Sequence, residues 1–473
     1  MFKYVKAVLI IILLVLGAQL VSGQTPTDTV LVAADSLVAD TAVEPVAEAA
    51  EGFASYEEFQ SSPGFVKFMI DNLWVLLSAF LVFIMHLGFA TVESGMNAAK
   101  NTVNVIYKNI FTLCAGIITY AIAGFALMYP GDFNIIPGFL GFAGFGIGFD
   151  AAAPADYLTS NYYASYTVWT DFLFQAMFAA TAATIISGAV AGRIKMPAYM
   201  LYAALIVTFA YPIAGSWKWG GGWLNDLGFH DFAGSTLVHA VGGTAALIAA
   251  WVLGPRIGKY TDGKVNDMPG HSFPLATIGV LLLWFGWFGF NGGSVLSADP
   301  AAISLVLVNT ALAAAAGSLA AMAAATFTMH KLDAPQALNG ILAGLVGITA
   351  GADVVMPGQA IVIGALAGVL VVLAVIAIDK LKIDDPVSAI AVHLVCGIWG
   401  TLAVGIWGAG KTFMPQLIGV ASIVAFTAIV SLLAIYLVKF TLGLRSDESV
   451  ELGGADESYH GNNAYPDFAP AKK

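Results

Sequence analysis

Two stretches of this sequence follow one pattern and decide the fold: Asp231–Gly243, which reads DFAGSTLVHAVGG, and Asp385–Gly397, which reads DPVSAIAVHLVCG. In both, a histidine (His239 or His393) stands eight residues after the aspartate and four before the glycine, among apolar residues. An ionisable side chain inside a membrane segment is costly and is usually functional. Two of them at matched positions predict an internal duplication with a pore or binding site at its centre.

The composition is that of a polytopic membrane protein. Of the 473 residues, 59% are hydrophobic and only 10% are charged, whereas a soluble domain carries about 25% charged residues. The net charge of −11 is not that of a nucleic-acid-binding protein. Cys114 and Cys396 lack metal-ligand spacing, and the sequence has no CxxC, Walker loop or GxSxG motif. We therefore expect a protein that is not an enzyme and that uses no metal and no cofactor.

The first 23 residues are typical of a secretory signal peptide. Lys3 and Lys6 precede a short apolar core at 7–18, and small residues follow at 21–23. The alternative is a retained first helix, but this apolar run is short for a membrane span. The expected division of the chain is a signal peptide at 1–23, a flexible acidic extracytoplasmic segment at 24–64, a transmembrane domain at 65–445 and a cytoplasmic tail at 446–473.

Eleven apolar segments follow the signal peptide, and most reach the ~20 residues that a helix needs to cross a bilayer. Transmembrane β-strands would be shorter and would alternate in polarity. We therefore predict an all-α polytopic membrane protein with eleven transmembrane helices, of which the eighth is short and rich in glycine. The predicted segments are 68–96, 102–130, 165–192, 197–216, 232–254, 272–294, 301–328, 336–352, 358–379, 387–408 and 416–441.

The distribution of basic residues sets the orientation. If the mature N-terminus lies outside, only Lys67, Lys218 and Lys411 fall on the outer side, and every other Lys and Arg of the mature chain falls on the inner side. Because cytoplasmic loops are enriched in Lys and Arg, this separation predicts an N-out, C-in topology. Asp231 then begins its helix outside and Asp385 begins its helix inside, so the two motifs run in opposite directions.

Each histidine lies roughly 12 Å along a helix from its aspartate, so we expect His239 and His393 to meet near the middle of the bilayer. Spans one to five and six to ten would then form inverted halves, with span eleven outside the repeat. Two neutral imidazoles can hydrogen-bond to each other and still face a small substrate. The alternatives are two separately satisfied core histidines and a metal site. A metal site would need further ligands at the same depth, and none occurs near either motif.

Asp231 and Asp385 stand just before their helices, where a carboxylate caps exposed backbone N–H groups; direct contact with a cation is the alternative. Aromatic residues cluster near the same segments, at 174–178, 217–222 and 284–294. Such residues often form core or interfacial contacts in membrane helices, but their ring faces can also hold a small cation.

With these motifs the chain resembles the Amt/Mep/Rh ammonium transporters, and specifically their Amt branch. The resemblance covers about residues 65–465. The segments that carry it are GFATVESGMNAAKN at 88–101, WGGG at 219–222, DFAGSTLVH at 231–239, GWFGFNGGS at 286–294, DDPVSAIAVHLVCGIWG at 384–400, GLR at 443–445 and GADESYHGNNAY at 454–465.

The resemblance implies roles for the residues at matching positions. Trp219, Phe178 and Ser294 would form an outer ammonium-recognition site, the rings through cation–π contacts and the hydroxyl as an acceptor. Asp231 would stabilise this site. Phe178 and Phe290 would form a stacked gate below it.

In the same family pattern, His239 and His393 would form a twin-histidine pore that Trp287 also lines. Ammonium would lose its proton at the outer site, and ammonia, with or without the proton, would cross the apolar pore. The alternatives are an ammonium sensor that acts through a partner protein and a channel for carbon dioxide, against which the aromatic recognition residues argue.

The resemblance also implies a homotrimer in the cell membrane, methylammonium as a substrate analogue and contact with a PII-type signalling protein at the cytoplasmic face. The chain departs from the family pattern at Asn97, where some members have Arg, at Ser388, where an acidic residue sometimes stands, and at two further places. Glu93-Ser94-Gly95 stands where some members have Tyr-Gly-Gly, and 460–465 reads HGNNAY in place of HGExAY. His86 has no family role, and we interpret it as a buried helix–helix contact.

Overall fold

The computed structural model describes residues 52–147 and 155–466. The predicted signal peptide, most of the acidic segment that follows it and the end of the predicted tail lie outside the described residues.

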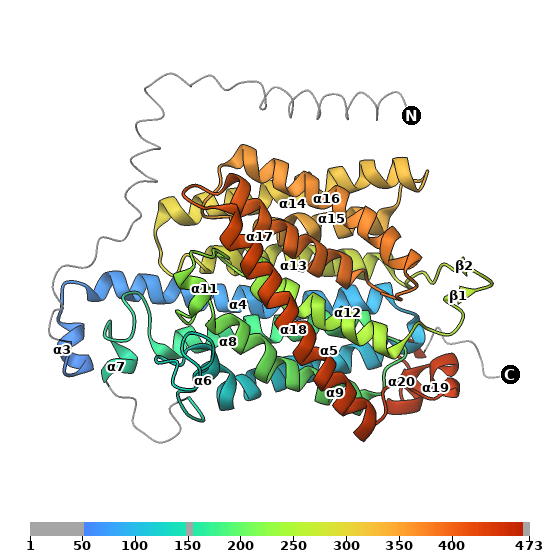
Figure 1. Cartoon of the computed structure of the whole chain (residues 1–473), viewed down its shortest axis with the longest axis horizontal. Helices are drawn as coiled ribbons and strands as arrows, with labels where there is room; N and C mark the ends of the chain where they lie inside the picture. Colours follow the sequence, from blue (N-terminus) through green and yellow to red (C-terminus); the bar gives the residue numbers. More distant parts are fainter. Residues whose placement is uncertain (1–51, 148–154, 467–473) are drawn as a thin grey trace.

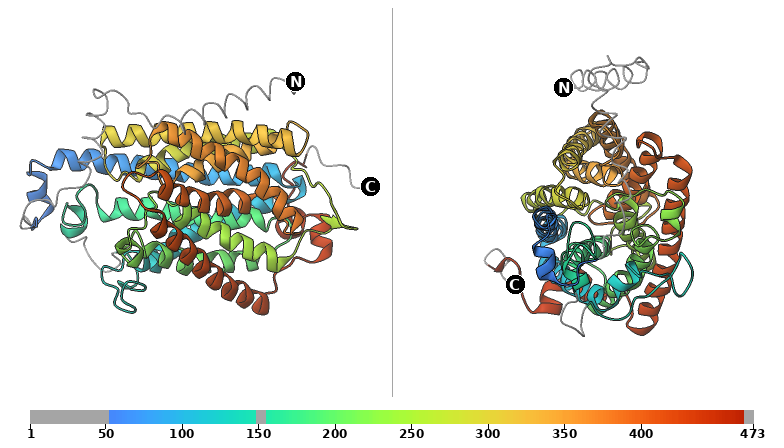
Figure 2. Two further views of the ribbon diagram at one scale, coloured as in Figure 1. Left: turned by 45° about the horizontal axis from the view of Figure 1, so that its top comes forward. Right: turned by 90° about the vertical axis from the view of Figure 1, so that its left-hand side faces the viewer.

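Long helices run side by side along one direction and form a bundle (Figure 1), and the end-on view shows them packed against one another (Figure 2). The elements in chain order are α3 (Tyr56–Gln60), α4 (Phe65–Met96), η1 (Ala99–Asn101), α5 (Thr102–Thr119), η2 (Tyr120–Gly124), α6 (Phe125–Met128), α7 (Ala155–Leu158), α8 (Val168–Ala189), α9 (Met196–Leu205), η3 (Ile206–Ala210), α10 (Tyr211–Ser216), α11 (Trp223–Asp226), η4 (Ser235–Ala240), α12 (Val241–Leu253), β1 (Tyr260–Thr261), β2 (Lys264–Val265), α13 (Phe273–Gly293), α14 (Pro300–Thr328), α15 (Ala334–Ile348), α16 (Pro357–Lys380), η5 (Ile390–Val395), α17 (Cys396–Trp407), α18 (Phe413–Thr441), α19 (Glu448–Gly453) and α20 (Ala455–His460).

Within the described residues, ten helical segments are long and apolar enough to cross a membrane. The chain is therefore a multi-pass membrane protein, and the predicted helical, polytopic fold is confirmed. Every predicted apolar segment coincides with a helix to within a few residues. The eighth is α15, which has only 15 residues and falls short of the length of the others. The count of eleven spans stays a prediction for this reason.

Small residues bring the helices into close contact. A Cβ added to Gly286 of α13 would lie 2.2 Å from the side chain of Met85 on α4, and one added to Gly368 of α16 would lie 2.1 Å from the carbonyl oxygen of Gly317 on α14. Lipid tails are as apolar as the side chains of a helix, so burying these side chains between helices brings no hydrophobic stabilisation. Helix association in a membrane therefore depends on such close packing. Larger residues at these positions would force the helices apart.

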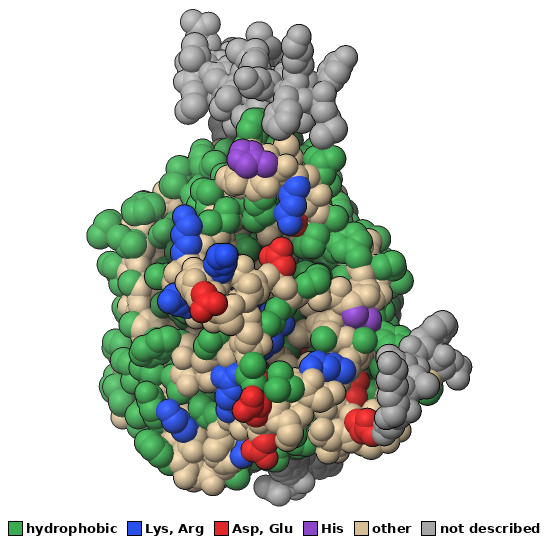
Figure 3. Space-filling view, turned by 90° about the vertical axis from the view of Figure 1, so that its right-hand side faces the viewer, with side chains coloured by type: hydrophobic (Ala, Val, Ile, Leu, Met, Phe, Trp, Pro, Cys, Tyr) green, Lys and Arg blue, Asp and Glu red, His purple; other side chains and the backbone are tan. Residues whose placement is uncertain are grey.

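Large apolar side chains cover the sides of the bundle. Ile118, Leu319 and Leu433 are each more exposed than buried in the isolated chain, at 59%, 62% and 69%. Figure 3 looks at one end of the bundle and shows apolar side chains around its rim, with Lys, Arg, Asp and Glu gathered on the end itself. An apolar belt with charged ends is the surface that a bilayer requires.

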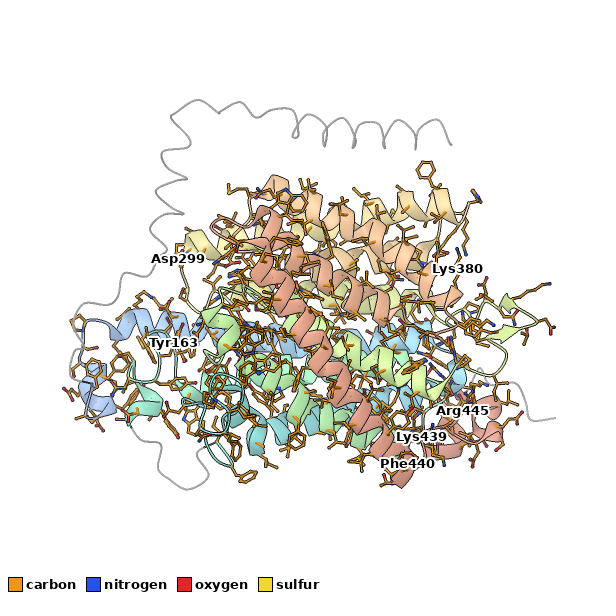
Figure 4. The ribbon with its side chains drawn as sticks, in the orientation of Figure 1. Tyr163, Asp299, Lys380, Lys439, Phe440 and Arg445 are labelled. Carbon is orange, nitrogen blue, oxygen red and sulfur yellow. The ribbon has the colours of Figure 1, made fainter. Side chains whose placement is uncertain are left out.

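The two ends of the bundle differ in charge. Lys380, Lys439 and Arg445 lie at one end, and Asp299 and Tyr163 lie at the other (Figure 4). We refer to these as the basic end and the far end. The predicted tail folds back on the basic end through α19 and α20 (Figure 1).

The two histidine motifs run in opposite directions through the bundle. The first continues through α12 to the basic end, where the Arg256 Nε atom donates to Asp384 at 2.7 Å. Asp384 directly precedes the second motif, which therefore starts at the end where the first one finishes. At the far end, the residues before η4 and those after α17 both contact the loop that follows α15. The antiparallel course inferred from the charge distribution is thus present in the structure.

Candidate functional site

Both predicted pore histidines lie on π-helical turns, His239 on η4 and His393 on η5. The sequence predicted regular α-helix at both places, since the pattern alone gives no sign of a π-turn. Such turns are rare and are frequently found at functional sites, although η2 and η3 are also π-helical. The first one begins after Gly234, whose φ of 108° is a left-handed value that a larger residue would adopt only with strain.

The carboxylate of Asp231 caps the first π-turn. Its Oδ1 accepts from the backbone N–H groups of Gly234 and Ser235, and its Oδ2 accepts from those of Thr236 and Leu237, at distances of 2.8 to 3.0 Å. The side chain is fully buried. Burial raises the pKa of Asp231, and these hydrogen bonds oppose the rise. All four contacts go to backbone, which is the arrangement of a structural cap.

Asp385 caps the second π-turn less completely. It accepts from the N–H groups of Ala389 and Ile390 at 3.0 and 2.7 Å, and it is only half-buried. Burial raises the pKa of Asp385 to about 6 despite these hydrogen bonds. Both aspartates of the repeated motif therefore cap a π-turn. Asp231 accepts four backbone hydrogen bonds and Asp385 accepts two.

The two imidazoles meet in the centre of the bundle. Their Nδ1 atoms lie 3.2 Å apart, and the rings stack with centroids 5.2 Å apart and an interplanar angle of 22°. His239 is 0% exposed and His393 is 4% exposed. The Nε2 atom of His239 is buried and has no hydrogen-bond partner among the described residues. A buried polar atom without a partner is costly, so this atom favours a small polar ligand beside it.

The motif glycines hold the two segments against each other. A Cβ on Gly243 would lie 2.5 Å from the backbone nitrogen of Leu394, and one on Gly397 would lie 2.3 Å from the carbonyl oxygen of Ser235. Each glycine thus packs on the π-turn of the other motif. This contact explains why both copies of the motif have a glycine at their last position.

A column of aromatic rings connects the far end to the histidine pair. Trp219 meets Phe178 edge-on at 6.4 Å, and Phe178 stacks on Phe290 at 4.0 Å with an angle of 22°. Phe290 in turn lies 5.4 Å from the ring of His239. Trp287 stacks on the same imidazole at 5.0 Å. Phe178, Phe290 and Trp287 are buried, whereas Trp219 is only half-buried.

Polar contacts fix the edges of this column. The indole N–H of Trp219 donates to the backbone carbonyl of Asp231 at 3.1 Å, and that of Trp287 donates to Thr349 at 2.8 Å. The hydroxyl of Ser294 donates to the carbonyl of Phe290 at 2.9 Å. Its lone pairs stay open to a donor such as ammonium. The half-buried Ser294 therefore joins the column through Phe290.

On the other side of the pair, His393 faces a small apolar cavity with a carboxylate in its wall. Phe89, Ile185 and Val392 line it together with His393 and Glu93. The sequence singled out Glu93 only as a departure from the family pattern, because a lone glutamate near a helix end gives no sign of which cavity it faces. Among the described residues, no group of three His, Cys, Asp or Glu side chains could hold a metal ion.

His86 lies elsewhere. Its buried side chain on α4 lies near the backbone of Met177 on α8. This is a contact between two helices, as interpreted from the sequence.

Comparison with known proteins identifies the family. The model of the Ammonium Transporter Family matches residues 73–465. The chain belongs to this family. A protein of Synechocystis sp. that is named for ammonium transport is 45% identical over 421 residues, which cover 87% of this chain and 92% of that protein. Ammonium transporter Amt2 of Archaeoglobus fulgidus is 38% identical, with 84% of this chain and 89% of the relative covered.

Solved structures of the ammonium transporter family share the fold. A structure named Sensor Amt Protein has a TM-score of 0.77 at 37% identity and covers 84% of this chain and 99% of its own. Mep2 of Candida albicans has a TM-score of 0.73 at 28% identity, with coverages of 85% and 92%.

In this ammonium transporter, a cluster of charged side chains around Asp384 stabilises the basic end. The Arg256 guanidinium binds both carboxylate oxygens of Asp384, at 2.7 and 2.8 Å, and Arg193 donates to the Asp384 carbonyl at 2.6 Å. Burial opposes ionisation of Asp384, but the hydrogen bonds from Arg256 and the charges of both arginines prevail and lower its pKa to about 2. The cluster ties the start of the second motif to the end of the first.

Proposed function

We propose that this chain carries ammonium across the cell membrane and that the aromatic column is its pathway. Trp219, Phe178 and Ser294 receive the cation at the far end. The rings supply cation–π attraction, which is worth about 0.5 to 2 kcal/mol per ring, and the hydroxyl supplies an acceptor. Asp231 stabilises this site in two ways. Its carboxylate caps the π-turn η4, and its backbone carbonyl accepts the hydrogen bond from the indole of Trp219.

Below this site, Phe178 and Phe290 act as a gate and His239, His393 and Trp287 line the pore. The stacked phenyl rings leave no polar surface for a hydrated ion. A desolvated ammonium ion in such surroundings is costly, whereas neutral ammonia is not. The cation therefore gives up a proton near the gate, and ammonia passes along the imidazoles.

The observation that carries the proposal is the series of ring contacts from Trp219 to the histidine pair. It joins a cation-attracting site to an apolar interior that contains the two imidazoles. The hydrogen bond between the imidazoles also offers a path for the released proton. The relatives named for ammonium transport support the choice of substrate.

The arrangement in the membrane is also a proposal. We place the basic end in the cytoplasm, because Lys and Arg gather there (Figure 3). We take α15 as the eighth of eleven spans in an inverted repeat of five and five. We further propose that the N-terminal signal peptide is removed. A homotrimer and contact of the basic end with a PII-type signalling protein follow from the family resemblance.

A sensor that signals through a partner is the second candidate, because one solved structure similar to this chain is named as a sensor. Growth of a host that lacks ammonium uptake separates the two functions. Rescue of growth on low ammonium supports transport. Failure to rescue, with the protein present at the cell surface, supports sensing.

Uptake into liposomes tests the proposal directly. The full chain is reconstituted and uptake of labelled methylammonium is measured, with ammonium and bicarbonate as competitors. We expect saturable uptake that ammonium blocks and bicarbonate does not. Absence of uptake by folded protein would contradict the proposed function.

A further inference from the structure

A carboxylate faces the pore on the basic-end side of the histidine pair. Glu93 of α4 and His393 of η5 line the same cavity, and they are the two titratable residues among its lining side chains. The space open to the centre of a water molecule is about 20 Å³, which is enough for about one water or one ammonia. One small molecule can therefore lie between the imidazole and the carboxylate.

Glu93 belongs to a buried polar cluster that the pathway described so far does not use. The hydroxyl of Ser187 donates to Glu93 Oε2 at 2.7 Å, and the Nζ atom of Lys108 donates to the carbonyl of the same serine at 2.9 Å. The exposed fractions of Glu93, Lys108 and Ser187 are 2%, 1% and 0%. Burying a carboxylate and an ammonium group in a membrane protein is costly, which favours a functional reason for both.

The geometry is not that of a closed structural ion pair. Ser187 bridges Glu93 and Lys108, whose charged atoms are not in direct salt-bridge contact. The second carboxylate oxygen, Oε1, is buried and forms no hydrogen bond with a described residue. An unpartnered acceptor in the wall of a cavity is the feature that a passing ligand would satisfy.

We propose that Glu93 is the proton-exchange residue at the basic-end exit of the pore, a role that rests on the proposed function. Ammonia that leaves His393 takes the carboxyl proton of Glu93: the O–H bond breaks and the fourth N–H bond of ammonium forms. The carboxylate left behind is stabilised by the Ser187 hydroxyl and by the charge of Lys108. A proton from water at the basic end then restores the acid.

Only a few other titratable groups near Glu93, among the described residues, could make the exit step depend on pH. Lys108 on α5, Tyr199 on α9 and His393 on η5 are the titratable groups that face it, with Arg193 behind Lys108. α13, which also packs on α4, contains no titratable residue. Lys108 and Tyr199 do not line the cavity, so the pH dependence of proton transfer to the ammonia that leaves His393 is expected to reside in Glu93.

The test uses the full chain in liposomes on a solid-supported membrane, with ammonium pulses at varied internal pH. Glu93→Gln is expected to lower the current at least tenfold and to flatten its dependence on internal pH, while Glu93→Asp keeps a measurable pH-dependent current. Asp71→Asn, a buried carboxylate on the same helix that does not line the cavity, is the matched control and is expected to behave like the unaltered protein.

Because Glu93→Gln leaves the buried Lys108 without a nearby negative charge, the double variant Glu93→Gln with Lys108→Met is measured beside it. Loss of current and of pH dependence in the folded double variant supports the proposal. An unchanged current, or a reduced current with an unchanged pH profile, would overturn it and leave Glu93 a structural residue. If the unaltered protein itself gives no ammonium current, it is the proposed function that fails.

Discussion

The Nδ1 atoms of His239 and His393 lie 3.2 Å apart, within hydrogen-bond distance. One of two neutral imidazoles must donate and the other must accept, so the pair consists of two opposite tautomers. The Nε2 atoms are then also unlike: one accepts and the other donates. A proton taken up at the accepting Nε2 can be matched by one released at the donating Nε2, so the pair can carry charge without any movement of its rings.

Replacement of Trp219 is expected to weaken substrate capture more than it slows transport. Trp219→Leu removes the exposed ring face and, at a cation–π energy near 1 kcal/mol, raises the KM for methylammonium uptake about fivefold to tenfold. Trp219→Phe keeps a ring, so its KM is expected to lie between that of the unaltered protein and that of Trp219→Leu. An unchanged KM in the leucine variant would remove Trp219 from the recognition site.

The two motif aspartates are expected to differ in their effect on stability. Asp231→Asn offers one acceptor oxygen where the carboxylate accepts four backbone hydrogen bonds, and it turns an NH2 group towards two N–H groups. We expect it to cost about 2 kcal/mol or more. Asp385→Asn affects two hydrogen bonds at a half-buried site and is expected to cost less. Thermal unfolding in detergent measures both, and a larger loss for Asp385→Asn would contradict the capping account.

The basic-end cluster is expected to stay intact through the pH range of transport. The depressed pKa of Asp384, about 2, means that its contribution to stability is present above the pKa of an unfolded aspartate, about 3.9. The contribution is lost as the pH falls from there towards 2. Melting temperatures between pH 5 and 8 should therefore show no loss from this cluster.

Asp384→Asn leaves the buried Arg193 and the partly buried Arg256 without their counter-charge, which costs about 3 to 5 kcal/mol when such a pair is broken. The variant should melt at a lower temperature at every pH from 5 to 8. A melting temperature equal to that of the unaltered protein would show that the cluster does not hold the two motifs together.

Asp456 is expected to anchor the tail. Its carboxylate caps the start of α5 by accepting from the N–H groups of Val103 and Asn104 at 3.0 and 2.9 Å. Asp456→Ala removes both hydrogen bonds and should expose 455–466 to limited proteolysis, whereas Glu448→Ala, at an exposed position of α19, serves as the comparison. Equal cleavage rates for the unaltered protein and the Asp456 variant would contradict this anchoring role.

Much of the fold was predictable because hydrophobic length and basic-residue asymmetry are properties of the sequence itself. The repeated motif also predicted the antiparallel course of the two segments, since Asp231 and Asp385 start from opposite charge environments. The short helix α15 is the segment whose status as a membrane span is least certain, both from the sequence and in the structure. Packing against other helices lets a buried segment be shorter than a lipid-facing one.

The sequence could not predict the π-turns at His239 and His393, because they arise from capping and packing that no local pattern shows. It also missed the relation between Glu93 and His393. These residues are 300 positions apart, and only the packing of α4 on the second motif brings them to one cavity. The aromatic column was recognised residue by residue, but its continuity depends on ring geometry that spacing does not determine.

Ammonium-evoked current through liposomes containing His239→Ala, His393→Ala or the double variant tests the central claim most directly. Because the two imidazoles act as one unit, each single variant is expected to lose at least tenfold in current and the double variant to lose little more. The melting temperature of each variant shows whether it is folded. Unchanged current and unchanged selectivity for ammonium in both single variants would contradict the twin-histidine pathway.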